Sequence, residues 1–190
     1  KVIVAITFDT EYPYGIPENE LNYTNEQKWI NAVESLRQIA EENSIRFQFN
    51  MLGKTAEDYP ELIKELSLSQ DISCHTYSHK NQTELNYSEK EYEISKCKEV
   101  LEKITGNEIK GNRFPYTKIT NDSFELLEKY SYKWDSSKYA DSIEEMVPYQ
   151  SGNLTEFPLL FAIDDWEYFM NEKNTDSKEF YNILYKDITS

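Results

Sequence analysis

Short apolar runs alternate with longer amphipathic segments along the whole chain. Residues 2–8 form an unbroken, mostly β-branched apolar run, which is typical of a parallel strand buried on both faces. Residues 45–52 alternate between apolar and polar side chains, which predicts a second strand. The remaining runs predict strands at residues 71–74, 109–116, 132–135 and 154–163.

Between these runs, apolar residues recur three or four positions apart, as they do on one face of a helix. Two capping boxes, Thr24 with Gln27 and Ser88 with Glu91, predict helix starts, and Gly106 predicts the end of the second helix. Pro60 interrupts a helical pattern over residues 55–68, so that helix is expected to kink or to begin at the proline. A further helix is expected to open at Asn121 or Asp122.

This alternation of strand and helix, without a long linker or an internal repeat, predicts an α/β fold with a parallel sheet, either open or closed into a barrel. A length of 190 residues favours one domain covering residues 1–190. In parallel α/β folds the functional residues gather at the carboxyl ends of the strands. Here each strand end carries polar residues, at Asp9 and Glu11, His75 and His79, Arg113 to Tyr116, Asp135 to Ser137, and Asp164 to Trp166.

His75 and His79 are the only histidines of the chain, and they lie four positions apart directly after a predicted strand. Two imidazoles and a carboxylate with an open position suit a divalent metal that activates water. Asp9 and Glu11 are two positions apart, so both face the same side of an extended strand end. One carboxylate could then ligate the metal while the other accepts a proton. The alternative is two histidines that are close by chance, with the carboxylates acting as turn caps.

The charge balance restricts the partners. Asp and Glu number 35 against 20 Lys and Arg, a formal net charge of −15. A negative field of this size repels phosphate backbones and anionic lipids, so we expect neither nucleic acid nor membrane insertion. Cys74 and Cys97 make no disulfide framework, and Cys74 is either a further metal ligand or a small buried side chain.

The compartment and the oligomeric state stay open. Because the first residues already form a predicted core strand, we expect the chain to be a domain of a longer precursor. It would be extracellular or in the cell envelope if that precursor is exported, and cytoplasmic otherwise.

Three stretches in this order, Thr7-Phe8-Asp9, His75-Thr76-Tyr77-Ser78-His79 and Arg113-Phe114-Pro115-Tyr116, resemble the polysaccharide deacetylase family, also called carbohydrate esterase family 4 or the NodB-homology domain. The resemblance implies an irregular (β/α)7-type barrel with parallel strands, either complete or incomplete at the carboxyl end of this chain. It also implies site roles: Asp9 as general base, His75 and His79 as metal ligands, Arg113 as the arginine that orients the base, and the Tyr116 N–H as an oxyanion donor.

Two departures from the family pattern change this picture. Thr10 stands where a second, metal-binding aspartate usually follows the base. A subset that includes peptidoglycan deacetylase-like and allantoinase-like members has Asp-x-Asp or Asp-x-Glu instead, which makes Glu11 the implied third ligand. The family's late histidine, its usual general acid, has no counterpart here, because no histidine follows His79. Either the chain stops before that motif, or another group is the acid, or the protein is a weak or silent member of the family.

The resulting functional hypothesis is a metal-dependent hydrolase, with zinc as the metal, that removes N-acetyl groups from an N-acetylated polysaccharide such as peptidoglycan, a chitin-like polymer or an exopolysaccharide. Trp166 at the last strand end would stack on a sugar face. Two alternatives remain: a cyclic-amide C–N hydrolase of the allantoinase-like type, and a non-catalytic carbohydrate-binding member of the family.

Overall fold

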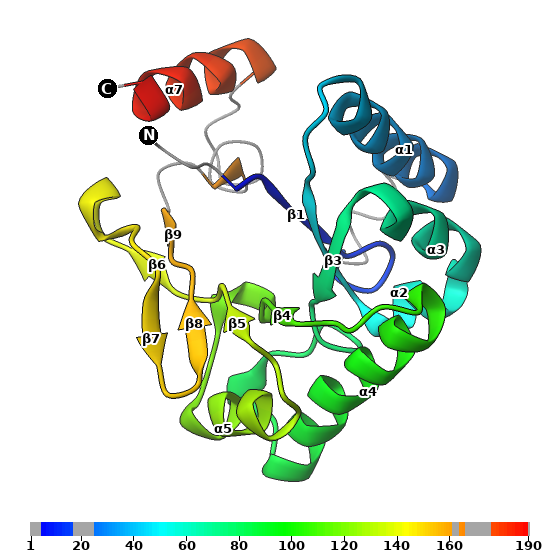
Figure 1. Ribbon diagram of the computed structural model, residues 1–190, viewed down its shortest axis with the longest axis vertical. Coiled ribbons are helices and arrows are strands. Elements are labelled where there is room, and N and C mark those ends of the chain that lie inside the picture. Colours follow the sequence, from blue (N-terminus) through cyan, green and yellow to red (C-terminus); the bar gives the residue numbers. More distant parts are fainter. Residues whose placement is uncertain (1–4, 17–24, 161–163, 166–175, 190) are drawn as a thin grey trace.

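The computed structural model describes residues 5–16, 25–160, 164–165 and 176–189. One mostly parallel sheet of seven strands, in the order β1-β2-β3-β4-β5-β8-β7, curves through the molecule with helices on its outer side (Figure 1). Its strands are β1 (Thr7–Thr10), β2 (Gln48–Met51), β3 (Asp71–Cys74), β4 (Gly111–Asn112), β5 (Trp134–Asp135), β7 (Tyr149–Ser151) and β8 (Leu154–Glu156). The expected parallel α/β fold is confirmed.

The first five strands and β8 are parallel, and β7 pairs with β8 antiparallel. Within the described residues β1 and β7 are the two edges of this sheet, so these residues do not close a barrel. A second sheet pairs β6 (Tyr139–Ala140) with β9 (Leu159–Leu160). The single strand expected over residues 154–163 is therefore wrong: the chain bends after β8, β9 joins another sheet, and residues 161–163 lie outside the described part.

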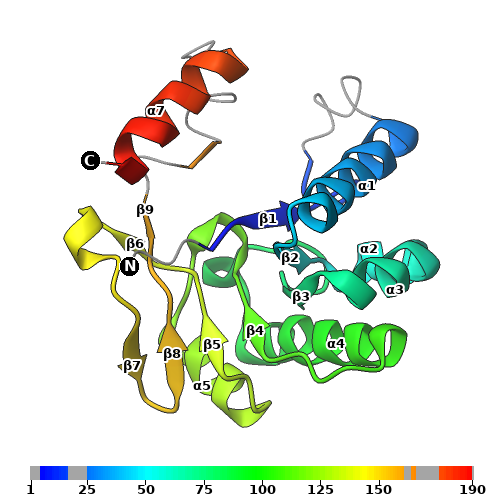
Figure 2. The same ribbon diagram turned by 45° about the horizontal axis from the view of Figure 1, so that its top comes forward.

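The helices cover the convex side of the sheet, as Figure 2 shows. They are α1 (Glu26–Glu42), α2 (Gly53–Asp58), α3 (Pro60–Ser69), α4 (Tyr87–Thr105) and α5 (Asn121–Lys129), and α7 (Ser177–Thr189) follows near the carboxyl end. Pro60 begins α3, as expected, because a proline is tolerated only in the first turn of a helix. Gly106 ends α4 in a left-handed conformation, also as expected. No described helix is long and apolar enough to cross a bilayer.

Two expected capping residues are corrected. The side chain of Asn25 caps α1 by accepting a hydrogen bond from the Lys28 N–H, one position after the expected cap at Thr24, a residue outside the described part. Asn86 and Glu89 form the capping box of α4, two positions before the expected pair Ser88 and Glu91. Asparagine is at least as strong a cap as serine or threonine, so the cap of α1 lies one position later, and the cap of α4 two positions earlier, than the Ser/Thr pattern predicted.

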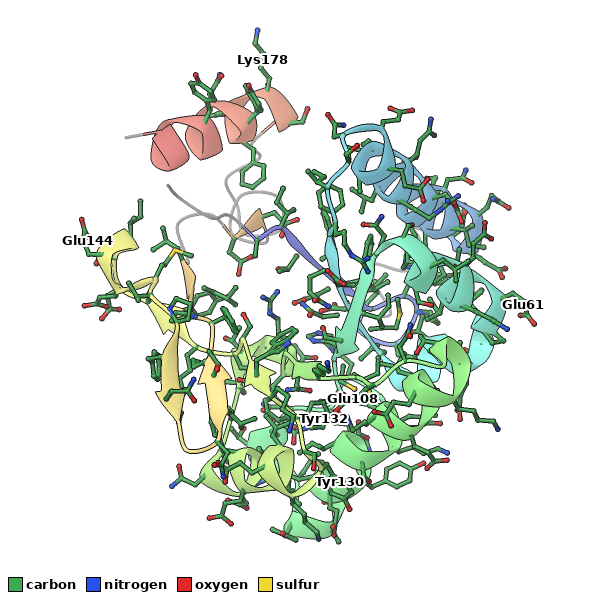
Figure 3. All side chains as sticks on the ribbon, viewed as in Figure 1. Glu61, Glu108, Tyr130, Tyr132, Glu144 and Lys178 are labelled. Atoms are coloured by element: carbon green, nitrogen blue, oxygen red, sulfur yellow. The ribbon has the colours of Figure 1, made fainter. Side chains whose placement is uncertain are left out.

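The strands are shorter than the apolar runs that predicted them, because a strand extends only where a neighbouring strand pairs with it. β1 begins at Thr7 rather than residue 2, and residues 1–4 lie outside the described part. β4 covers two residues of the expected 109–116, and Pro115–Thr117 form a short 3₁₀ turn instead. The core between sheet and helices is apolar and contains Phe49, Met51, Ile63, Leu66, Ile94, Leu101, Leu126 and Leu127, all buried. Charged residues such as Glu61, Glu144 and Lys178 point outward at the periphery (Figure 3).

Candidate active site

Three metal-type donors converge at the carboxyl ends of β1 and β3. Glu11 Oε1 lies 3.2 Å from His75 Nε2 and 3.0 Å from His79 Nε2. One ligand atom from each residue lies within 4.8 Å of the others, and these three residues could hold a metal ion. Cys74 is buried and is not part of this group; the Tyr132 hydroxyl lies 2.9 Å from its Sγ. The structure therefore places Cys74 in the core.

Glu11 is held next to the rings by a tight turn after β1. The Gly15 N–H donates to the Glu11 carbonyl over 2.8 Å. A Cβ at position 15 would lie 2.5 Å from Glu11 Cβ and 2.7 Å from Glu11 Oε2, so a residue without a side chain is needed here. Thr10 is buried, 5% exposed, with its hydroxyl near the Phe8 carbonyl, and it lies outside the donor group. Glu11, not Thr10, is thus the residue beside the histidines.

The tautomer of His75 follows from its hydrogen bond. His75 Nδ1 lies 2.8 Å from the Arg113 carbonyl oxygen, and because a carbonyl can only accept, Nδ1 carries the proton. Nε2 then points toward Glu11 with its lone pair whenever the ring is neutral. Burial lowers the pKa of His75, but the Asp9 and Glu11 carboxylates outweigh it and leave this pKa above its ordinary value.

The neighbouring rings act on Glu11 in the opposite sense. Burial would raise the pKa of Glu11, but hydrogen bonds and charges from His75 and His79 lower it to about 2. Glu11 is therefore an ionised carboxylate at neutral pH, which is the form that binds metal.

The loop that carries both histidines is bent so that the two rings approach each other, with centroids 5.3 Å apart. Thr76 and His79 both have positive φ, at 63°. A buried carboxylate fixes this loop: Glu93 on α4 accepts hydrogen bonds from the Ser78 N–H (2.7 Å) and the Ser78 hydroxyl (2.6 Å). The helical pattern of residues 88–105 gave no sign that Glu93 has this position, because it reads as one more charge on a helix.

Asp9 lies beside the metal-type group without joining it. Its Oδ1 accepts hydrogen bonds from Asn50 Nδ2 (2.6 Å) and Arg113 Nη1 (3.1 Å), and its Oδ2 lies 4.0 Å from His75 Nε2. A third of the Asp9 side chain, 33%, is accessible. Burial tends to raise the pKa of Asp9, but Arg113, His75 and Asn50 together hold it below the ordinary 3.8. Sequence reasoning missed Asn50, although a polar residue near the carboxyl end of β2 indicated that its side chain could reach Asp9.

Arg113 is almost fully buried, 5% exposed, and its guanidinium is bonded on every side. Besides Asp9, it donates to the Thr7 hydroxyl (2.8 Å), to the Ser136 carbonyl (2.9 Å) and to the Ser136 hydroxyl (2.9 Å). The contact between Arg113 and Asp9 that the resemblance implied is present. Asp135, the neighbour of Ser136, does not reach this group and is buried below it.

A cavity of about 570 Å³ opens next to His79. Its lining residues are His79, Lys80, Asn81, Glu84, Leu85 and Tyr116. The Tyr116 ring, 59% exposed, meets the His79 ring edge-on with centroids 4.8 Å apart. Tyr116 has φ 58°, and no described residue accepts a hydrogen bond from its N–H. The expected sugar-stacking Trp166 lies outside the described residues, while nearby Asp164 accepts a hydrogen bond of 2.5 Å from the Tyr139 hydroxyl.

Comparison with known proteins identifies the family of this fold and donor set. The family model described as "Polysaccharide deacetylase" matches residues 1–134. The chain belongs to the polysaccharide deacetylase family. A peptidoglycan-N-acetylglucosamine deacetylase from Bacillus cereus is 30% identical over 133 residues, which are 70% of this chain and 42% of that protein.

Two solved structures share the fold at low sequence identity. One is a candidate polysaccharide deacetylase from Mycobacterium smegmatis, with a TM-score of 0.72 and 23% identity over 86% of this chain and 60% of that one. The other is Puue allantoinase, with a TM-score of 0.74 and 14% identity over 96% of this chain and 69% of that one. The chain thus spans less than half the length of the Bacillus cereus relative it matches.

Proposed function

We propose that this chain forms the metal-binding catalytic part of an N-deacetylase that acts on an N-acetylated carbohydrate polymer. The observation that carries the proposal is the juxtaposition of two groups: the Glu11, His75 and His79 donors, and the Asp9 carboxylate held by Arg113. A metal-type donor set beside a separate ionised carboxylate is the arrangement that hydrolysis of an amide by activated water needs.

The residues fit a divalent metal by their chemistry. The Nε2 atoms of His79 and His75 are buried and lie 3.0 and 3.2 Å from the same Glu11 oxygen, so both ring nitrogens face one carboxylate. With Glu11, they offer two imidazole nitrogens and one carboxylate oxygen, a set suited to zinc with an open fourth position. When bound, the metal would polarise the acetyl carbonyl and make the attacking water more acidic.

The chain's own residues supply the remaining steps. Asp9 is ionised, so its Oδ2 can accept the proton of the attacking water, and Arg113 keeps it in this form. The Tyr116 N–H would donate to the oxyanion that forms on the acetyl carbon, a contribution of roughly 3–4 kcal/mol at comparable sites. Asp9, once protonated, can return its proton to the leaving amine.

The polar cavity beside His79 and the exposed ring of Tyr116 support a sugar as the substrate, because sugars bind through hydrogen bonds and through stacking on aromatic faces. The Bacillus cereus relative suggests N-acetylglucosamine in peptidoglycan as the first substrate to test. Such a substrate would place the protein outside the cytoplasm. A cyclic-amide hydrolase is the second candidate, favoured by the Asp9-x-Glu11 spacing.

The test measures acetate release from peptidoglycan and from N-acetylglucosamine oligomers, and in parallel the hydrolysis of allantoin, after loading the protein with Zn²⁺. We expect acetate release, and we expect Asp9→Asn to lower it by roughly 10²–10⁴-fold with unchanged zinc content, since it removes the base but keeps its shape. Hydrolysis of allantoin alone would favour the second candidate. Sugar binding without acetate release, equal in wild type and Asp9→Asn, would identify a non-catalytic carbohydrate-binding member.

A further inference from the structure

Two buried carboxyl groups lie on neighbouring strands close to the Arg113 guanidinium, and the proposed chemistry uses neither of them. Asp135 ends β5, Glu156 ends β8, and the two are register partners on neighbouring parallel strands. Both residues are fully buried, with 0% exposure. Because register partners on neighbouring parallel strands direct their side chains to the same face of the sheet, the two carboxyl groups lie side by side.

In each carboxyl group of this pair, one oxygen accepts hydrogen bonds and the other has no donor within the described residues. Asp135 Oδ1 accepts from Asn112 Nδ2 and from the Ser137 hydroxyl, each over 3.0 Å. Glu156 Oε1 accepts from the N–H groups of Ser137 (3.1 Å) and Lys138 (3.2 Å). Asp135 Oδ2 and Glu156 Oε2 are buried and have no donor within the described residues. Two ionised oxygens only repel each other, whereas one proton between them would give both a partner.

The surrounding charges do not neutralise two carboxylates. Within the described residues neither Asp135 nor Glu156 forms an ion pair. Arg113 is committed to Asp9, and Lys138 Nζ lies over aromatic rings, 4.9 Å from the nearer centroid. Burial and the charge of Glu156 raise the pKa of Asp135 to about 7, against smaller opposing effects of hydrogen bonds and of Arg113. Burial likewise raises the pKa of Glu156, with Lys138 opposing.

The pair also anchors the segment that holds Arg113. Ser136 accepts two hydrogen bonds from the guanidinium, one at its carbonyl and one at its hydroxyl, each over 2.9 Å. The next residue, Ser137, is bonded to both carboxyl groups of the pair, and its hydroxyl accepts a hydrogen bond from the Phe114 N–H over 2.8 Å. Ser136, which contacts the guanidinium, therefore lies between Asp135 itself and Ser137, and Ser137 is bonded to both carboxyl groups of the pair.

We propose that Asp135 and Glu156 share one proton, and that the singly ionised pair positions Ser136 against Arg113 and so holds Asp9 in place. The positioning half of this inference rests on the proposed deacetylase function, whereas the shared proton does not. When the proton leaves, two buried negative charges face each other, and the segment that carries Ser136 and Ser137 loses its support.

Glu156→Gln is the informative variant. Its amide oxygen can still accept from Ser137 and Lys138, and its amide N–H replaces the shared proton in donating to Asp135 Oδ2. The variant has the shape and net charge of the singly ionised pair wherever Asp135 is ionised, and it cannot reach the doubly ionised state at any pH. Glu156→Ala removes the acceptor altogether, and Asp141→Asn changes an exposed carboxylate as a matched control.

The first readout is stability, which needs no catalysis. Between the ordinary carboxyl pKa of 3.8 and about 7, the folded protein keeps a proton that the unfolded chain has released. The contribution of this proton to the free energy of unfolding therefore falls as pH rises through this window and is lost above it. Denaturant unfolding should show this loss in wild type and Asp141→Asn, and Glu156→Gln should remove it. The further fall above pH 6.5 that comes from the raised pKa of His75 should stay in all three proteins.

The second readout is acetate release as a function of pH. Glu156→Gln should keep kcat/KM within about threefold at neutral pH and extend activity to higher pH. Glu156→Ala should lower kcat/KM by about 10–100-fold with unchanged metal content, as expected for a displaced arginine. If Glu156→Ala does not fold, the comparison of Glu156→Gln with wild type still tests whether Asp135 and Glu156 share a proton.

Three results would overturn the proposal: an unchanged pH dependence of stability in Glu156→Gln, an activity loss in Glu156→Gln as large as in Glu156→Ala, or a loss of bound metal in Glu156→Gln. The last would mean that a cation sits between the carboxyl groups, with Asn112 Oδ1, a third buried oxygen lacking a partner in the described part, as a further ligand. If wild type itself releases no acetate, the proposed function fails, while the stability data still test the shared proton.

Discussion

Adding a single methyl group at Gly15 should weaken metal binding without touching any proposed ligand. The Cβ of an alanine would lie 2.5 Å from Glu11 Cβ and 3.0 Å from Glu11 Cδ. Carbon atoms in ordinary contact are about 3.5–4.0 Å apart, so Glu11 or the turn must move by about 1 Å. Because Cβ is fixed to the Glu11 backbone, rotation of the side chain cannot relieve this contact. The turn must therefore open against the hydrogen bond from the Gly15 N–H to the Glu11 carbonyl, and this movement displaces Glu11.

A displacement of this size matters because a zinc–carboxylate bond tolerates little variation around about 2.0–2.2 Å. Disturbing the groups that orient a ligand commonly costs about 10–100-fold in metal affinity, or roughly 1.4–2.7 kcal/mol. We therefore expect Gly15→Ala to raise the Kd for Zn²⁺ by about this factor. Competition with a chromophoric chelator measures it directly.

A double-mutant cycle makes this test specific. Gly15→Ala acts through Glu11, so it should have no further effect on zinc affinity in a Glu11→Ala background. Gly106→Ala is the control, because Gly106 has φ 73° and nothing within 4 Å of an added Cβ. That variant should lose stability and keep its zinc affinity. Wild-type affinity in Gly15→Ala, or equal losses in both backgrounds, would show that the turn at Gly15 does not act on zinc binding through Glu11.

Three further outcomes follow from the same site. The double variant His75→Ala/His79→Ala should abolish stoichiometric zinc in elemental analysis, and retained metal would place the site elsewhere. Arg113→Ala removes the main cation that holds the pKa of Asp9 low, so the acid limb of the pH–rate profile should move to higher pH. An unmoved limb would show that Arg113 does not set the pKa of the group that acts as base. Glu93→Ala leaves the Ser78 N–H without its buried acceptor and should lower the free energy of unfolding by about 1.5–3 kcal/mol in denaturant titration, together with zinc affinity. Stability equal to wild type would show that the histidine loop does not depend on this bond.

The local pattern of the sequence was sufficient for the element types and for much of the site. Continuous apolar runs and helical spacing report burial within one element, and they predicted the parallel α/β fold correctly. The rule that the carboxyl ends of parallel strands share one edge of the sheet predicted that Asp9, Glu11, His75, His79 and Arg113 lie together. Local pattern was weaker at boundaries, where Asn25 and Asn86 competed with nearby Ser and Thr residues for the cap position.

Tertiary structure alone decided which polar groups meet across strands. Asn50 reaches Asp9 because the two are register partners on β1 and β2, and Asp135 meets Glu156 for the same reason on β5 and β8. Glu93 supports the histidine loop because α4 packs under it. Strand order, register and helix packing result from the burial of the whole apolar core, whereas periodicity along the chain records only the environment of each residue on its own element. The sequence by itself therefore predicted which polar residues gather at the candidate site, and the assembled core determined which residues contact and orient them.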